Sequence, residues 1–177
     1  MTVLQGDRVV LRPLRRGEFD VVLRGRTATS DAAAITFDVE EVRRRIEASG
    51  DMTDWGLLLG IESGGRLVGE VQGYRTPMPA VFGIGIVLYE QADRGRGSGG
   101  DAVRAMTRHL FDEEGARRVE GGTTPDNAAM RHIFTALGFV EEGTLRRFLP
   151  GSDGEGVDCV MYGMTRQDYR EASAEWI

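Results

Sequence analysis

The stretch Arg94-Gly95-Arg96-Gly97-Ser98-Gly99-Gly100 joins a predicted strand to a predicted helix. Glycines allow a backbone to turn its N–H groups toward one point, and the start of a helix adds a partial positive charge there. Arg94 and Arg96 add full charges. The stretch therefore predicts a cradle for a pyrophosphate group. The alternative is an ordinary glycine-rich turn with surface arginines, because 25 of the 177 residues are glycine.

Two widespread phosphate-binding loops do not match this stretch. A P-loop requires Gly-Lys-Ser or Gly-Lys-Thr, and the sequence contains no lysine. A dinucleotide fingerprint follows the first strand of a βαβ unit. Here the preceding runs 55–61, 67–74 and 81–88 are strand-like, are joined by turns and predict an antiparallel meander instead.

The rest of the chain predicts one domain over residues 1–177. Before the meander we expect a strand over 8–14, a short helix, a loop over 24–36 and a helix that begins at the capping box of Asp38 and Glu41. After the loop helix, we expect a strand over 117–123 and a helix capped by Asn127. A closing hairpin over 139–148 and 157–164 precedes a charged tail from residue 166.

Composition limits the classes of function. The net charge of −6 argues against nucleic acid as the main partner, because phosphate binding needs a basic face. All 22 basic residues are arginine, which excludes a lysine nucleophile. Cys159 is the single cysteine, which excludes an intramolecular disulfide and a multi-cysteine zinc site. With no signal-peptide pattern and no long apolar run, we expect a cytoplasmic protein without a membrane partner.

Several separated motifs resemble those of the GNAT superfamily of acyltransferases. The loop from Arg94 to Gly99 matches the Arg/Gln-x-x-Gly-x-Gly/Ala signature of that family. Asn127, followed by Leu137-Gly138-Phe139, matches its second motif. The runs 8–14 and 157–162 are similar to the opening and closing strands of the ribosomal-protein N-acetyltransferase-like (RimJ/RimL-type) branch. The resemblance covers about 8–165.

The resemblance implies an α/β (α+β) fold, with a mixed, mostly antiparallel twisted sheet that is splayed at its central strands and flanked by about four helices. It implies acetyl-CoA as co-substrate and no metal. The pyrophosphate would lie on the amides of the 94–100 loop, and the pantetheine arm would pair with the strand at Val87 and Leu88. Asn127 and Arg131 would lie beside the cofactor. The branch also implies a possible homodimer.

The implied reaction moves an acetyl group from the CoA thioester to a primary amine of a protein N-terminus, a small metabolite or an antibiotic. A backbone N–H of Val87 or Leu88 would stabilise the oxyanion. Glu120, on the strand beside the split, is the candidate general base, because an attacking amine must first lose a proton.

Two positions depart from the family pattern. Met130 and Phe134 replace residues whose hydroxyl groups could protonate the departing thiolate in other members. This leaves open a second interpretation, a CoA-binding sensor or interaction protein with little catalytic turnover. Further candidates for a catalytic role are Glu70, Glu141, Glu142 and His132.

Overall fold

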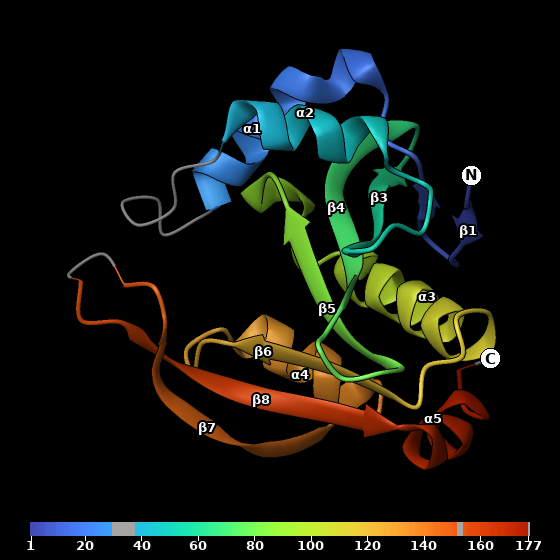
Figure 1. The fold of residues 1–177 in the computed structure, drawn as a ribbon, viewed down its shortest axis with the longest axis vertical. Coiled ribbons are helices and arrows are strands. Elements are labelled where there is room, and N and C mark those ends of the chain that lie inside the picture. The colour runs from blue at the N-terminus through green and yellow to red at the C-terminus, as the bar shows by residue number, and fades with distance from the viewer. Residues whose placement is uncertain (30–37, 152–153, 177) are drawn as a thin grey trace.

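The computed structural model describes residues 1–29, 38–151 and 154–176, and it contains one eight-stranded sheet (Figure 1). The strands lie in the order β1-β2-β3-β4-β5-β6-β8-β7. They are β1 (Leu4–Gln5), β2 (Val10–Arg12), β3 (Gly56–Ser63), β4 (Arg66–Arg75), β5 (Val81–Leu88), β6 (Arg118–Thr123), β7 (Val140–Leu149) and β8 (Val157–Thr165). Every pair is antiparallel except β5 with β6, which confirms the mixed, mostly antiparallel sheet.

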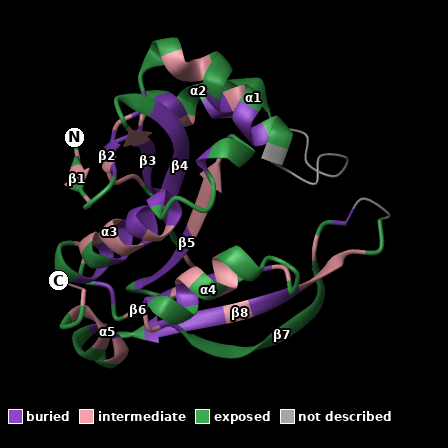
Figure 2. Ribbon diagram, turned by 180° about the vertical axis from the view of Figure 1, so that it is seen from behind, coloured by how far each residue is buried: buried purple, intermediate pink, exposed green. Residues whose placement is uncertain are grey.

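The helices cover both faces of this sheet. They are α1 (Phe19–Thr29), α2 (Val39–Glu47), α3 (Ser98–Asp112), α4 (Ala128–Ala136) and α5 (Arg166–Ser173). Helices α1 and α2 pack on one face, and α3 and α4 pack on the other, which is the nearer face in Figure 2. The described residues thus contain five α-helices, where about four were expected.

The additional helix, α5, begins in what the sequence predicted to be a charged tail. Thr165 and Asp168 form a capping box at its start. Tyr169, which is buried, stacks on Phe111 of α3 with ring centroids 4.4 Å apart. The Arg166 guanidinium also donates to Phe111 C=O at 2.9 Å, so the polar composition of this segment concealed an anchored helix.

Helix α1 also extends beyond its prediction. The sequence predicted a loop from residue 24, but α1 continues to residue 29. Gly25 lies against the ring of Tyr89, and the Arg26 guanidinium donates to both carboxylate oxygens of Glu70 at 2.7 and 3.0 Å. These tertiary contacts outweigh the weak local helix preference of this stretch. Residues 30–36 of the predicted loop lie outside the described residues.

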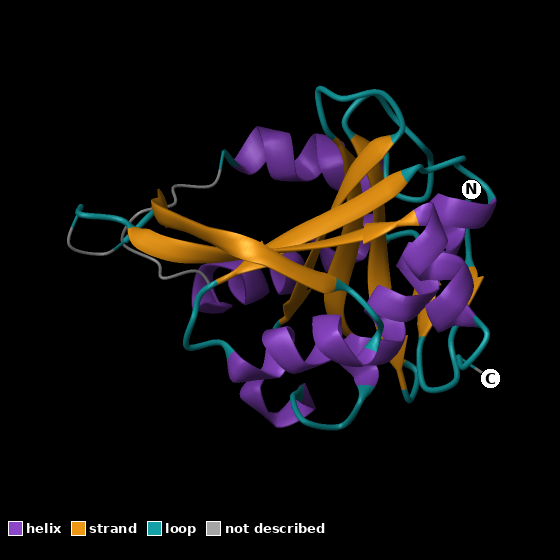
Figure 3. Cartoon of the chain, turned by 90° about the horizontal axis from the view of Figure 1, so that it is seen from below, coloured by secondary structure: helices purple, strands orange, loops and turns teal. Residues whose placement is uncertain are grey.

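The central feature of the sheet is a split between β5 and β6. The two strands pair only over Val81–Gly83 and Arg118–Glu120, and beyond this point they diverge (Figure 1). The ring of Phe134, only 1 % exposed, lies against Gly121 where the pairing ends, and Ile84 packs beside it. Figure 3 shows the twisted sheet from below, with the β7–β8 hairpin extending past the helices. The splayed sheet is therefore confirmed.

A buried carboxylate attaches the N-terminal strands to α3. Asp101, in the first turn of α3, accepts the backbone N–H groups of Asp7, Arg8 and Val9 at 3.2, 2.7 and 3.1 Å. The Arg104 guanidinium donates to the same carboxylate at 2.6 Å. Burial acts to raise the pKa of Asp101, but these hydrogen bonds outweigh it and hold the pKa below the ordinary value.

Asp101→Ala should lower the free energy of unfolding by about 2–3 kcal/mol, because three N–H groups and one guanidinium lose a charged acceptor. The native pKa lies below that of the unfolded chain, so the stabilisation is present at neutral pH and is lost as the pH falls through the native pKa. Denaturant unfolding across the acid range measures both effects. Asp54→Ala, at an exposed position, is the control, and a difference from wild type that stays constant toward low pH would contradict the assignment.

Candidate functional site

The glycine-rich loop forms the start of α3. Gly97 is the N-cap residue with φ of +84°, and Gly95 has φ of +72°. Both lie in the left-handed region that favours glycine. The first N–H groups of a helix have no partner within it, and the glycine cap has no side-chain acceptor to offer them. The amides of Ser98, Gly99 and Gly100 can therefore bind an anion.

Three arginines surround this helix start. Arg94 and Arg96 are exposed in the loop, and Arg94 donates to the side-chain oxygen of Gln91 at 3.0 Å. Arg8 is the third, because its Cδ and Nε lie 3.2 Å from the position of a Cβ on Gly97. No sequence signal pointed to Arg8, which lies near the N-terminus and is placed by the bond from its backbone N–H to Asp101.

The free edge of β5 begins at the split. Tyr89 N–H donates to Val68 C=O on β4 at 3.0 Å, and Arg117 N–H donates to Ala80 C=O at 2.8 Å. Successive residues of a strand direct their backbone N–H and C=O groups to opposite edges of that strand. Because Tyr89 bonds to β4, the odd-numbered residues of β5 also bond to β4. The even-numbered Ile84, Ile86 and Leu88 then direct their backbone groups toward the split. Of the two predicted donors, Leu88 faces the split, whereas Val87 faces its register partner Glu70.

Apolar side chains connect this edge to the loop. A Cβ on Gly99 would lie 3.6 Å from Leu88, 3.7 Å from Ile86 and 3.5 Å from Ile133 of α4. The start of α3 thus sits directly over the wide end of the split. A ligand phosphate at the loop would lie in line with β5.

Helix α4 brings Asn127 and Arg131, the two residues predicted to lie beside the cofactor, to different places. The Asn127 side-chain oxygen accepts the N–H of Met130 at 3.1 Å, so the predicted N-cap is confirmed. Arg131 donates to the Tyr162 hydroxyl at 3.2 Å and to the Glu141 carboxylate at 3.4 Å. Arg131 is therefore held on the β7–β8 side of α4.

Glu120 lies at the narrow end of the split. It is the register partner of Gly83, in the last pair that joins β5 to β6. Its Oε2 accepts from Arg118 Nε at 2.9 Å, and Arg118 also binds Glu142 through both terminal nitrogens. The Glu120 side chain remains 29 % exposed, so its second oxygen can accept a proton.

The other candidate groups have structural partners or lie elsewhere. Glu70 is buried between Arg26 and the Tyr89 hydroxyl, which donates to it at 3.1 Å. Burial and the Glu70 charge raise the pKa of Tyr89 well above its ordinary value. His132 is exposed on α4. Cys159 is buried, and burial raises the pKa of its thiol.

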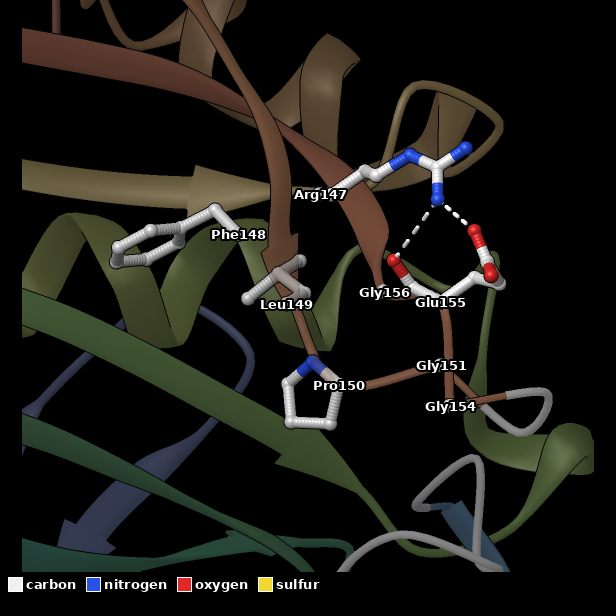
Figure 4. Close-up of a pocket in the computed structure, with 8 residues that line it drawn as sticks. All are labelled: Arg147, Phe148, Leu149, Pro150, Gly151, Gly154, Glu155 and Gly156. Atoms are coloured by element: carbon white, nitrogen blue, oxygen red, sulfur yellow. Dashed lines mark hydrogen bonds and ion pairs between the residues drawn. The ribbon is translucent and has the colours of Figure 1, made fainter.

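Other possible sites are separate from the split. Figure 4 shows an open hollow at the free end of the β7–β8 hairpin, lined by residues 147–151 and 154–156, where Arg147 contacts Glu155. All of these residues belong to the hairpin. Across 1–29, 38–151 and 154–176, no group of three or more His, Cys, Asp or Glu side chains could hold a metal ion. No helix in those ranges is long and apolar enough to cross a bilayer.

A comparison with known protein families identifies the family of this chain. Residues 8–140 match the acetyltransferase (GNAT) domain. The chain belongs to the GNAT acetyltransferase family. This confirms the family resemblance and the expected class of enzyme.

Solved structures show the same GNAT fold. The chain is similar to Mycobacterium smegmatis RimJ in complex with CoA-disulfide, with 21 % identity, a TM-score of 0.77 and coverage of 99 % of this chain and 92 % of that one. It is also similar to the ribosomal-protein-S5-alanine acetyltransferase from Vibrio fischeri, with 17 % identity, a TM-score of 0.77 and coverage of 96 % and 99 %. The microcin C7 self-immunity acetyltransferase MccE, in complex with acetyl-CoA and AMP, shares 17 % identity, with a TM-score of 0.73 and coverage of 90 % and 93 %.

Gly97→Glu should abolish detectable acetyl-CoA binding in calorimetry, because a carboxylate would enter the anion site of this GNAT domain. Gly115→Glu is a matched control, since Gly115 also has a positive φ, +68°, and lies beyond the far end of α3 with nothing within 4 Å of its Cβ position. The control carries the same backbone strain and the same charge change. Equal affinities of the two folded variants would reject the loop as the phosphate site.

Proposed function

We propose that the protein is an acetyl-CoA-dependent N-acetyltransferase that transfers the acetyl group directly to a primary amine in a ternary complex. The observation that carries the proposal is the split itself, with an anion-binding helix start at its wide end and a carboxylate at its narrow end. A cofactor with a pyrophosphate, an extended amide-bearing arm and a terminal thioester fits this order of groups.

The cofactor would be bound by three features of the split. The pyrophosphate would accept from the amides of 98–100, with Arg94 and Arg96 beside it. The pantetheine arm would pair with the free edge of β5 as an added strand. Asn127 would lie along the arm, whereas Arg131, held by Tyr162 and Glu141 on the β7–β8 side of α4, is left out of the proposed cofactor site. The complexes of RimJ with CoA-disulfide and of MccE with acetyl-CoA and AMP support this choice of cofactor.

The chemistry requires a neutral amine and a stabilised oxyanion. An alkyl amine has a pKa of about 10, so only about one molecule in a thousand is neutral at pH 7. Glu120 would attract the ammonium group and take its proton, directly or through one water. Leu88 lies beside the loop, about four residues from the narrow end, so a split-facing backbone N–H nearer to Glu120, that of Ile84 or Ile86, would donate to the oxyanion of the tetrahedral intermediate.

The acceptor would be a protein N-terminal amine or the amine of a small metabolite or antibiotic. The Vibrio fischeri neighbour is an S5-alanine acetyltransferase, which supports an amine acceptor. We place the reaction in the cytoplasm, because the chain has a single cysteine and therefore no intramolecular disulfide. Neither nucleic acid nor a membrane is part of the proposal.

We further propose a homodimer. Strand β7 is an edge strand whose residues are exposed over most of its length, as Figure 2 shows, and unpaired edges readily add a further strand. Exposed apolar side chains, Leu145 at 42 % and Phe148 at 63 %, lie on this strand.

Sedimentation equilibrium should give about twice the chain mass of 19.4 kDa, and Phe148→Glu should reduce it to that of the monomer because a charge would be buried at the interface. Met78→Glu alters an equally exposed apolar residue on the β4–β5 turn and serves as the control. A monomeric wild-type protein at working concentration would rule out the dimer.

Thiol release from acetyl-CoA, measured against a panel of amines and peptides, tests the function. Glu120→Gln should lower turnover by ~10²-fold at pH 7 and leave acetyl-CoA affinity near the wild-type value. The defect should shrink as the pH rises toward the pKa of the amine, since free base becomes plentiful. Glu113→Gln, at an exposed position beyond α3, is the control.

Two outcomes would contradict the proposal at different levels. Normal turnover of Glu120→Gln at pH 7 would remove Glu120 from the mechanism but leave the enzyme assignment standing. A wild-type protein that binds acetyl-CoA and releases no thiol with any amine would instead favour a CoA-binding sensor or interaction protein.

A further inference from the structure

A phenol and a carboxylate flank the narrow end of the split. Tyr74 on β4 is the register partner of Gly83 on β5, and Gly83 is the register partner of Glu120 on β6. Register partners in adjacent strands place their side chains on the same face of a sheet. The three residues therefore form a row across three strands, at the last position where β5 and β6 are paired.

Gly83 allows Tyr74 to lean over the middle strand. A Cβ at Gly83 would collide with the Cζ and the hydroxyl oxygen of Tyr74. The ring thus lies over a position without a side chain, and its hydroxyl is directed toward the β6 side of β5. Burial and, after it, the charge of Glu120 raise the pKa of Tyr74, which agrees with this placement.

The hydroxyl of Tyr74 differs from those of the other three tyrosines. Tyr89 donates to Glu70, Tyr162 donates to Glu141, and Tyr169 donates to Asp112. Within the part of the chain that the structure describes, the Tyr74 hydroxyl makes no hydrogen bond. Tyr74 is 39 % exposed, so a ligand can reach it. No group among the described residues is bonded to this hydroxyl, so it is available to a substrate.

The narrow end of the split is within reach of the cofactor's sulfur. Pantetheine carries two amide units and a cysteamine end, so its extended length equals that of about four strand residues, ~13 Å. Counting back four residues from Leu88, which lies beside the loop, leads to Ile84. Ile84 is the neighbour of Gly83 in the chain, so the sulfur would lie next to the row of Tyr74, Gly83 and Glu120.

We propose that Tyr74 is the general acid that protonates the departing thiolate. This inference rests on the proposed acetyl transfer with Glu120 as base. The ammonium proton first leaves through Glu120 to solvent, so that the amine is neutral. The amine nitrogen then bonds to the acetyl carbon and gives one proton to Glu120. The carbon–sulfur bond breaks, and the Tyr74 hydroxyl gives its proton to the sulfur. The phenolate then recovers the proton held by Glu120, so both side chains return to their starting states.

The protonation state of Tyr74 suits this role. Burial, followed by the charges of Glu120 and of Cys159, raises the pKa of Tyr74 above its ordinary value. The phenol therefore holds its proton at neutral pH and is a donor rather than a base. Phe134, on the opposite face of the sheet at the same level, has no proton to give.

Tyr74→Phe tests the role, because it removes the hydroxyl and keeps the ring. We expect kcat with acetyl-CoA to fall by about 10-fold or more. The acetyl-CoA Kd, the KM of the amine and the melting temperature should stay at wild-type values, since no protein hydrogen bond is lost. Tyr169→Phe removes a hydroxyl on α5, away from the split, and should leave kcat unchanged.

A second acyl donor separates proton donation from a structural effect. Acetyl-seleno-CoA has the same shape, but its selenolate departs without a proton, so the ratio of wild-type to Tyr74→Phe kcat should approach one. Three outcomes would overturn the inference. They are an equal defect with both donors, a normal kcat with acetyl-CoA, and a change confined to the KM of the amine.

If wild-type protein binds acetyl-CoA but releases no thiol, the proposed function fails and this inference fails with it. An active wild type with an equally active Tyr74→Phe variant overturns the inference alone.

Discussion

The early end of pairing between β5 and β6 is the constraint on which the rest of the structure depends. A strand in the middle of a sheet normally exchanges hydrogen bonds on both edges, and buried backbone groups without partners are costly. Beyond Gly83, β5 is bonded to β4 on one edge only. The Phe134 ring packs on Gly121, beside Ile84, at the point where the pairing ends. The sheet thus retains an internal edge that a strand-like ligand can complete.

The two halves of the sheet are held by different helices. Helices α1 and α2 cover the meander and hold β5 through Tyr89, whereas α4 packs on the other half through Phe134. Helix α3 is common to both, because Met106 and Leu110 belong to the core that joins them. The Asp101 carboxylate fixes the start of α3 to the N-terminal strands. The width of the split is therefore set by helix packing on both sides rather than by the strands that border it.

The sequence predicted the features that depend on local chemistry. The glycine loop, the Asn127 cap, the meander and the closing hairpin each have turn or capping signals within a few residues, and the structure confirms them. The features it did not predict depend on contacts between distant segments. Arg8 reaches the loop only through the fold, and α5 is anchored by one buried tyrosine in a charged stretch.

The side-chain environment of the candidate site required the structure for the same reason. Glu120 could be placed on β6 from sequence, but its face, its bond to Arg118 and its alignment with Tyr74 depend on strand register. A shift of one residue would turn each of these side chains to the opposite face. Sequence periodicity locates strands only to about one residue. An error of one residue is enough to misplace the side chains of a site built across three strands.

Most ion pairs among the described residues are made by guanidinium groups, as in the pairs of Arg26 with Glu70 and of Arg118 with Glu142. A guanidinium keeps its proton at all physiological pH values and is a poor nucleophile, whereas an ammonium group can lose its proton and attack an activated acyl group. Because the sequence contains no lysine, no side-chain amine of the protein competes with the acceptor for the thioester. The guanidinium groups that support the fold are therefore poor nucleophiles toward acetyl-CoA, the molecule that the site is proposed to bind.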